Sequence, residues 1–271
     1  MQSLFLMRYS FFGRSDWRSD ASRTADLLFD SARLEKRAVL LEQIALRSLS
    51  DQTDGDFGLI VLSSEGMPAP FRTRLAALCK DTLGDRAHVL FEAPERAAYC
   101  IDQFRRRSLT ATGPHVIQSI LDDDDAVGAG FVETIKREAA AAVSLFHAGQ
   151  TYTFISHAKG VNLVFRPDGG IELRRRNMPA AAQGLTLVSK SGTTRSPFNI
   201  AHKKILERRP VRVIHGGPVM YLRSVHDTND SRAMVGGKLV SEADIDRIIA
   251  QDLPLLGQFR DRLVLEKDAT D

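Results

Sequence analysis

The sequence has little of what marks several protein classes. Among its 271 residues only Cys79 and Cys100 are cysteines, and they stand in neither a CxxC pair nor a Cys/His spacing, so no zinc site of that type is predicted. No run approaches the roughly 20 apolar residues that a membrane-spanning helix needs, and the apolar start of the chain is too short for a signal peptide. These absences predict a protein of the reducing cytoplasm with at most peripheral membrane contact.

A strong net charge is also absent. The formal net charge is +3 and charged residues are 26% of the chain, which is ordinary for a folded protein. We therefore expect no nucleic-acid partner. Three arginine clusters, at 105–107, 174–176 and 208–209, could each face a phosphate or an anionic membrane, although such clusters are more commonly solvated surface. The length suits one large α/β domain spanning residues 1–271.

The first part of the chain alternates strand-like and helix-like segments. Apolar residues recur at helical spacing from Glu35 to Leu49, after a polar stretch from Ser10 to Ser31 that is expected to be a loop. Three strand-helix units in succession predict a mainly parallel sheet with right-handed crossovers. The expected strands are 3–9, 57–62, 88–91 and 115–121, and the expected helices are 35–49, 70–83 and 94–107.

After the expected helix at 129–148 the pattern changes. Short strand-like segments follow one another, and Pro167–Gly170 has the composition of a hairpin turn. This predicts antiparallel strands added to the parallel part, and so a mixed sheet. Ser241 is the expected N-cap of a C-terminal helix. The expected strands are 151–156, 161–166, 171–176, 185–189, 211–214 and 219–225, and the expected helices are 129–148, 197–207 and 241–263.

Four consecutive carboxylates, Asp122 to Asp125, follow the fourth expected strand. Adjacent carboxylates repel one another, so a folded protein that keeps them together offsets the repulsion with water, a cation or a helix N-terminus. One interpretation is a divalent-metal site at the carboxyl end of a buried strand, and the other is a solvated acidic turn that caps the following helix. Locally the two are equally supported. Adjacent side chains of an extended segment point opposite ways, so all four acids cannot bind one ion.

The acids, their place after the fourth strand and the mixed sheet behind them make the chain resemble glycosyltransferases of the GT-A fold. More narrowly, it resembles the bacterial rhamnosyltransferase family over most of its length. That family's acid-rich LDxDDA box and late His-x-x-Asn are both present, whereas Gln118–Ile120 departs from the Thr-Arg expected before the box. The stretches that carry the resemblance are 7–9, Arg37 with 40–42, 46–49, 52–57, 121–126 and 225–229.

This resemblance implies a metal-dependent glycosyltransferase that moves a sugar, with rhamnose as a candidate, from a nucleotide-diphosphate donor to a saccharide acceptor. It implies a GT-A-like α/β fold with a Rossmann-like nucleotide-binding half over about residues 1–128. The acceptor half would be about 129–271 and include a smaller antiparallel portion. Such an enzyme holds Mn²⁺ or Mg²⁺ on the donor's diphosphate. It would work in the bacterial cytoplasm, at most at the surface of the inner membrane.

The same resemblance assigns roles to residues. The metal ligands would be Asp124, Asp125 and His226. If the reaction inverts the anomeric centre, a carboxylate must also take the acceptor's proton. The sequence offers several candidates, and we choose Asp125 for this catalytic base, ahead of Asp168 and Asp227. Without the resemblance, His226 would more simply be a histidine at a strand end that bonds to a neighbouring carbonyl. Likewise, Arg8 would be an ordinary surface arginine and Arg37 a buried ion-paired one. The residues expected to contact the donor are Arg8, Arg37, Asp122, Asp123 and Asn229, with Ser231 as a further candidate.

Two other functions fit parts of the sequence. Clustered acids with a divalent ion also serve nucleotidyl- or phosphoryl-transfer enzymes, which would hold two metal ions about 3.5–4 Å apart. Alternatively, the arginine clusters could belong to a non-catalytic module that binds a polyanion or a membrane surface. Its binding would fall steeply with salt and would persist after the acids are neutralised.

Overall fold

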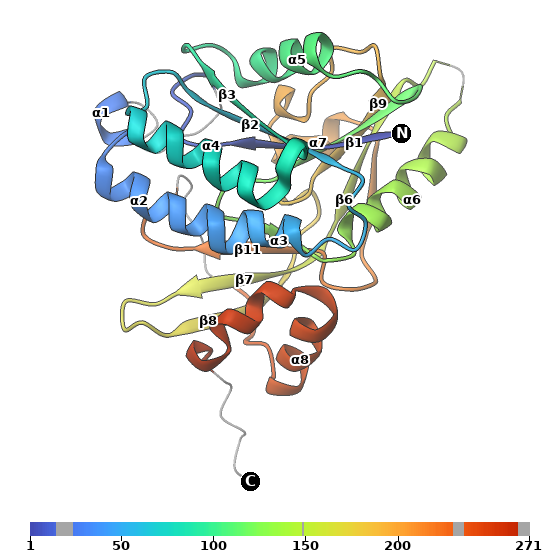
Figure 1. Ribbon diagram of the computed structural model, residues 1–271. Helices are drawn as coiled ribbons and strands as arrows, with labels where there is room; N and C mark the ends of the chain where they lie inside the picture. Colours follow the sequence, from blue (N-terminus) through green and yellow to red (C-terminus); the bar gives the residue numbers. More distant parts are fainter. Residues whose placement is uncertain (15–23, 148, 230–235, 265–271) are drawn as a thin grey trace.

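The computed structural model describes residues 1–14, 24–147, 149–229 and 236–264. Seven strands form its main sheet: β1 (Gln2–Arg8), β2 (Gly58–Ser64), β3 (Ala87–Glu92), β4 (His115–Ile120), β6 (Tyr152–His157), β9 (Thr186–Lys190) and β10 (Val211–Ile214). Their order is β10-β6-β9-β4-β1-β2-β3. Figure 1 labels β1, β2, β3, β6 and β9 of this sheet. β3, β2, β1 and β4 are parallel neighbours, whereas β9 runs antiparallel to β4 and β6. The predicted α/β fold with a parallel first part and a mixed sheet is confirmed.

Helices cover both faces of this sheet. α2 (Ser31–Leu40) continues through a π turn (Leu41–Leu46) into α3 (Arg47–Ser50), so the helix predicted at 35–49 is confirmed and is longer than expected. The other long helices are α4 (Ala69–Leu83), α5 (Ala97–Ser108) and α6 (Phe131–Ser144).

Alternate side chains of β1 point to opposite faces, as strand geometry requires. Phe5 and Met7 pack in the core with α2, α4 and α6, whereas Leu4 and Leu6 pack in a second core with α5. The sheet is therefore buried on both sides, which explains why its parallel strands read as continuous apolar runs.

A smaller sheet follows, in the order β5-β11-β7-β8. The chain first contributes β5 to it and returns to it after Ala158, which alone separates β6 from β7. The predicted hairpin between β7 and β8 is confirmed, with Gly169 at a positive φ of 85° in its turn. We expected an antiparallel portion, but β11 and β7 are parallel, so the smaller sheet is mixed. Its strands are β5 (Ala126–Val127), β7 (Lys159–Phe165), β8 (Ile171–Asn177) and β11 (Tyr221–Val225).

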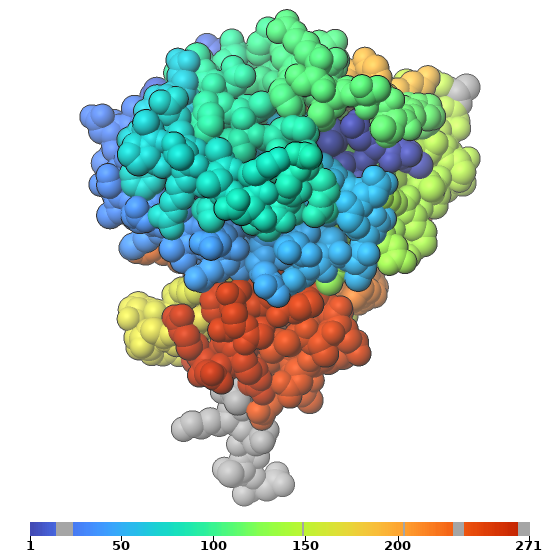
Figure 2. Space-filling view, in the orientation of Figure 1, coloured from blue at the N-terminus to red at the C-terminus, as the bar shows by residue number. Residues whose placement is uncertain are grey.

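The C-terminal segment covers the smaller sheet and encloses a separate apolar core with it. Figure 2 shows this segment, in red, packed beneath the blue helical segment of α2 and α3. Gln258 joins the two by donating from Nε2 to the Gln43 carbonyl at 2.8 Å. The second half of the chain thus supplies β6, β9 and β10 to the large sheet and most of the small one, while the division of the chain at about residue 128 stays a prediction.

Two predicted helices were wrong as continuous elements. At 241–263 the chain forms α8 (Glu242–Arg247) and a π turn (Ile248–Asp252), and then a 3₁₀ segment (Pro254–Arg262). Pro254 has no N–H and disfavours a helical conformation in the residue before it, so the helix stops at Leu253. The N-cap prediction for Ser241 is confirmed, because its side chain accepts from the Asp244 N–H.

At 197–207 the expected helix is replaced by two 3₁₀ turns (Pro197–Asn199 and His202–Lys204) and α7 (Ile205–Arg208). Ile200 between them is extended, with φ −147° and ψ 137°. Phe198, Ile200 and Ile205 all pack on the sheet, and an extended residue lets these three reach it where a single helical stripe would not.

Part of the expected loop from Ser10 to Ser31 is helical, because α1 (Ala25–Leu28) lies within it. Residues 15–23 of that loop and Ser231 lie outside the described part of the chain. No helix in the described ranges has the length and apolar character needed to cross a membrane.

Candidate functional site

The four acids lie where the direction of the sheet order changes. The chain passes from β1 outward to β2 and β3, and then returns to β4 on the other side of β1. Leu121, which directly follows β4, donates from its N–H to the Leu6 carbonyl at 3.2 Å, and Asp125 N–H closes a turn on the Asp122 carbonyl at 3.2 Å. Open α/β sheets bind ligands at such a switch point, outside the carboxyl ends of the strands.

Asp122 faces Arg8 at the carboxyl end of β1. The Arg8 Nη2 atom lies 3.3 Å from Asp122 Oδ1, and the Arg8 guanidinium carbon lies 4.6 Å from the centre of the Phe198 ring. Stacking and ion pairing together orient this guanidinium at the strand ends. Arg8 is thus within the expected site, beside the acid run.

Arg37 of α2 lies against the next two acids. Its Nε and Nη2 atoms both donate to the Asp123 carboxylate, with Nε 3.0 Å from Oδ2, and its Nη1 lies 2.7 Å from Asp124 Oδ2. All three side chains are buried. Burial raises the pKa of Asp123 to about 7, even though the Arg37 charge opposes this rise. One arginine therefore compensates most of the repulsion between two adjacent acids.

Asp124 is the most heavily bonded of the acids. Besides Arg37, its Oδ2 meets His226 Nε2 at 2.9 Å and Asn229 Nδ2 at 3.0 Å. Burial alone would raise the pKa of Asp124, but the Arg37 charge and the His226 hydrogen bond outweigh it and hold that pKa below its ordinary value. Asp124 is therefore ionised at neutral pH.

His226 follows β11 of the smaller sheet, so residues about a hundred positions apart in sequence meet here. Its Nδ1 lies 2.9 Å from Thr228 Oγ1 and 3.2 Å from the Thr228 backbone nitrogen, so Thr228 holds this side of the ring while Nε2 faces Asp124. Asn229 ties the pair together, because its Oδ1 accepts from the His226 backbone N–H at 2.7 Å. These contacts fix the orientation of the imidazole.

Asp125 turns toward the interior instead. Its Oδ2 accepts from Gln183 Nε2 at 2.6 Å and its Oδ1 from the Ser224 backbone N–H of β11 at 3.0 Å. Burial raises the pKa of Asp125 well above its ordinary value, and the charges of Asp124 and Asp122 add to the effect. This environment disfavours the ionised form that a catalytic base needs.

Of the three expected metal ligands, Asp124 and His226 have the spacing of two ligands of one divalent ion, whereas Asp125 faces Gln183 and Ser224. Two adjacent ligands of an octahedral ion at about 2.1 Å lie roughly 3 Å apart, which matches the 2.9 Å between Asp124 Oδ2 and His226 Nε2. No group of three or more His, Cys, Asp or Glu among the described residues is arranged to hold a metal. The protein would thus supply two ligands, and a bound ligand would have to complete the coordination.

This geometry gives little support to the two other functions, a two-metal nucleotidyl- or phosphoryl-transfer enzyme and a module that binds a polyanion or a membrane surface. The described acids do not build a two-ion centre, because Asp123 and Asp125 are committed to Arg37 and to Gln183. The arginine cluster of β8 is not a free basic surface either. Its members pair with carboxylates or an amide, as in Arg174 with Glu172, Arg175 with Asp244 and Arg176 with Asn162.

Sequence comparison places the chain beside one family. The profile of the family described as "Putative rhamnosyl transferase" matches residues 2–238. No curated protein sequence matches the chain.

Solved structures similar to this chain include S. aureus TarS 1-349 in complex with UDP-GlcNAc, at 14% identity and a TM-score of 0.44, over 97% of this chain and 72% of that one. A second is S. aureus TarS 1-349 described without a ligand, at 10% identity and a TM-score of 0.41, over 83% of this chain and 60% of that one. The chain thus spans about 60% of that structure's length. A third is described as "putative nucleotide-diphospho-sugar transferase from Desulfovibrio desulfuricans G20", at 11% identity and a TM-score of 0.39, over 97% of this chain and 100% of that one.

Proposed function

The chain belongs to the family described as "Putative rhamnosyl transferase", and from that membership and the geometry of the acids we propose that it transfers a sugar from a nucleoside diphosphate donor to a saccharide acceptor with the aid of a divalent metal ion. The observation that carries the proposal is the meeting of Asp124 and His226 at 2.9 Å beside Arg8, at the switch point of the sheet. Rhamnose is the first donor sugar to test, because the family's description names it.

In this proposal Asp124 and His226 hold Mn²⁺ or Mg²⁺, and the donor's phosphates complete the coordination. One or two protein ligands plus substrate phosphates is a common arrangement for these ions. The bound ion would neutralise charge that develops on the departing nucleoside diphosphate.

The remaining residues position the donor and the ligands. Arg8 offers a guanidinium fork to the diphosphate, for which its planar geometry is suited. Asn229 orients both Asp124 and His226, and Arg37 holds the acid run in place while keeping Asp124 ionised. The donor-contact roles of Asp122 and Asp123 stay predictions, and Asp125 would act as the catalytic base only if it loses the proton that its buried setting retains.

The proposal predicts that binding of a nucleoside diphosphate depends on both the metal and Asp124. Calorimetric titration with a panel of nucleoside diphosphates, with and without Mn²⁺, should show one that binds only with the metal. Asp124→Asn should weaken that binding by about a hundredfold or more, since even outer-shell partners of a metal contribute tenfold to a hundredfold.

Asp168→Asn is the matched control, because this exposed carboxylate lies in the β7–β8 turn and should leave binding unchanged. Donor identity follows from hydrolysis or transfer assays with nucleoside diphosphate sugars, rhamnose first. If no nucleoside diphosphate shows metal-dependent binding, or if Asp124→Asn binds as the unaltered protein does, the proposal is wrong.

A further inference from the structure

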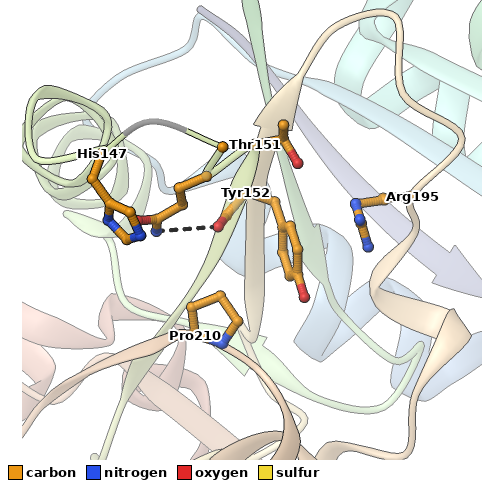
Figure 3. A pocket seen from close by; sticks show the side chains of 7 residues that line it. His147, Thr151, Tyr152, Arg195 and Pro210 are labelled. Carbon is orange, nitrogen blue, oxygen red and sulfur yellow. Dashed lines mark hydrogen bonds between the residues drawn. The ribbon is translucent and has the colours of Figure 1, made fainter.

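A hollow lies apart from the acid run, at the start of β6 (Figure 3). Its volume is about 320 Å³, within the range of small-molecule sites. The side chains that line it come from the segment after α6, from the start of β6, and from the segments that follow β9 and precede β10. They belong to His147, Gln150, Thr151, Tyr152, Arg195 and Pro210.

The register of the strands places this hollow at the far end of the sheet from the acids. Tyr152 is the first residue of β6 and lies opposite Ser189, which in turn lies opposite Val116 near the start of β4. The acids follow the other end of β4. Six strand residues at about 3.3 Å each separate the two ends by roughly 20 Å. The hollow is therefore a separate feature.

Its chemistry is that of a positively charged site. The Arg195 guanidinium carbon lies 4.0 Å from the centre of the Tyr152 ring, so the aromatic face holds this cation in place. An adjoining depression shares Tyr152 and Arg195 and adds Arg209. Within the described part of the chain, no carboxylate lines either one.

These arginines differ from others on the surface. Arg174 pairs with the Glu172 carboxylate of its own strand, and Arg175 and Arg212 each pair with a carboxylate of a neighbouring element. Arg195 has no such partner among the described residues, and Arg209 donates only to the adjacent Arg208 carbonyl, at 3.0 Å. The guanidinium donors are thus held at a concave surface without an anion from the protein.

The other side chains that line the hollow add hydrogen-bond donors, which an anion requires. Figure 3 shows His147 and Arg195 on opposite sides of Tyr152. Gln150 donates from Nε2 to the Tyr152 carbonyl at 3.3 Å, which fixes its amide at the rim. The His147 imidazole, the Thr151 hydroxyl and the Arg195 guanidinium around one hollow can all donate hydrogen bonds to an oxyanion.

We propose that this hollow, together with the adjoining depression, binds a phosphate group, either as the free ion or on a sugar, with Arg195 shared by both and Arg209 of the depression as its main contacts. A guanidinium fork matches phosphate oxygens in two-point fashion, and a fork already stacked on an aromatic ring loses little freedom when it binds. The inference does not depend on the proposed transferase function.

The test is a titration of ¹⁵N-labelled protein, followed by the amide resonances of Gln150, Thr151 and Tyr152. The probes are inorganic phosphate, pyrophosphate, glucose 1-phosphate and glucose. We expect saturable shifts at these amides with the phosphate probes and none with glucose. Tighter binding of glucose 1-phosphate than of phosphate would identify a sugar phosphate as the ligand, and equal binding would identify the free ion.

Variants distinguish this site from the acid run and from general charge effects. Arg195→Gln should weaken the binding about tenfold or more, as expected for lost charged hydrogen bonds, and Arg209→Gln should weaken it as well. Arg72→Gln is the matched control, because Arg72 also lies over an aromatic ring, that of Phe91, but lines neither hollow. Arg8→Gln should leave these shifts unchanged. The absence of shifts at the three amides, or equal affinity in Arg195→Gln and Arg72→Gln, would overturn the proposal.

Discussion

At the end of β6, His157 is buried and neither of its ring nitrogens has a hydrogen-bond partner in the described part of the chain. Burial lowers the pKa of His157 to about 4 from an ordinary 6.5. Between these values the unfolded chain takes up a proton that the folded chain does not, so the stability contributed by this group falls as the pH drops from about 6.5 to 4. By pH 5 the loss is about 2 kcal/mol.

Replacing His157 by leucine should remove this loss. Urea unfolding gives the free energy of unfolding of both proteins at pH 7.5 and at pH 5. The difference between the two proteins should shift by about 2 kcal/mol in favour of the variant from pH 7.5 to pH 5. Asp123 acts in the opposite direction, since its raised pKa of about 7 adds stability as the pH falls, but it is present in both proteins and cancels. Identical pH dependence in the two proteins would contradict the assignment to His157.

Single residues of the candidate site differ in how well the sequence reveals them. Four adjacent acids and a His-x-x-Asn stand out, and the structure brings Asp124, His226 and Asn229 together. Gln183 could not be found in the same way, because a single glutamine in an alanine-rich turn before β9 has no distinguishing spacing. The contact between Ser224 and Asp125 could not be predicted either, because Ser224 makes it with its backbone N–H, a group that every residue except proline has.

At the scale of elements, the connection from β5 into α6 depends on a close approach of two backbones. A Cβ added at Gly128 would lie 2.7 Å from the Val219 carbonyl oxygen and 3.3 Å from that of Asp252. Gly128 also donates to the Met220 carbonyl at 3.0 Å, so the strand cannot move away without losing this bond. Gly128→Ala should therefore lower the free energy of unfolding by about 1–3 kcal/mol, the usual range for overpacking.

Gly130 provides the control, two residues further along the same connection. A Cβ there would meet nothing within 4 Å, and its φ of −89° suits any residue. Gly130→Ala should change the free energy of unfolding by no more than about 0.5 kcal/mol. Urea unfolding of both variants at one pH compares them directly, and equal effects would show that the close approach at Gly128 is not the cause.

The elements themselves were predicted well where the apolar pattern was regular. The first four strands and the helices between them lie where the sequence placed them, since buried parallel strands are continuous apolar runs. The expected helix at 197–207 failed because Phe198, Ile200 and Ile205 serve the sheet surface rather than a helix stripe. The two-residue strand β5 is too short to leave a periodic signal.

At the scale of the whole molecule, the acid run connects the two sheets. Asp124 and Asp125 follow β4 of the large sheet. They bind His226, which directly follows β11 of the small sheet, and the Ser224 N–H, which lies within β11. Ile44, in the helical segment that packs on the large sheet, also belongs to the core between the small sheet and the C-terminal segment. A ligand bound at the acids would therefore contact both sheets.

This arrangement predicts that metal and donor together stabilise the entire fold. At a hundred times its dissociation constant a ligand adds about 2.7 kcal/mol, which corresponds to a rise in Tm of about 5 °C or more for a chain of this size. Differential scanning calorimetry with Mn²⁺ and the nucleoside diphosphate that binds should show one transition, shifted further than by either alone. Asp124→Asn should lose the shared increment while Asp168→Asn keeps it. Two transitions, only one of them shifted, would show instead that the sheets unfold independently and that the acids do not couple them.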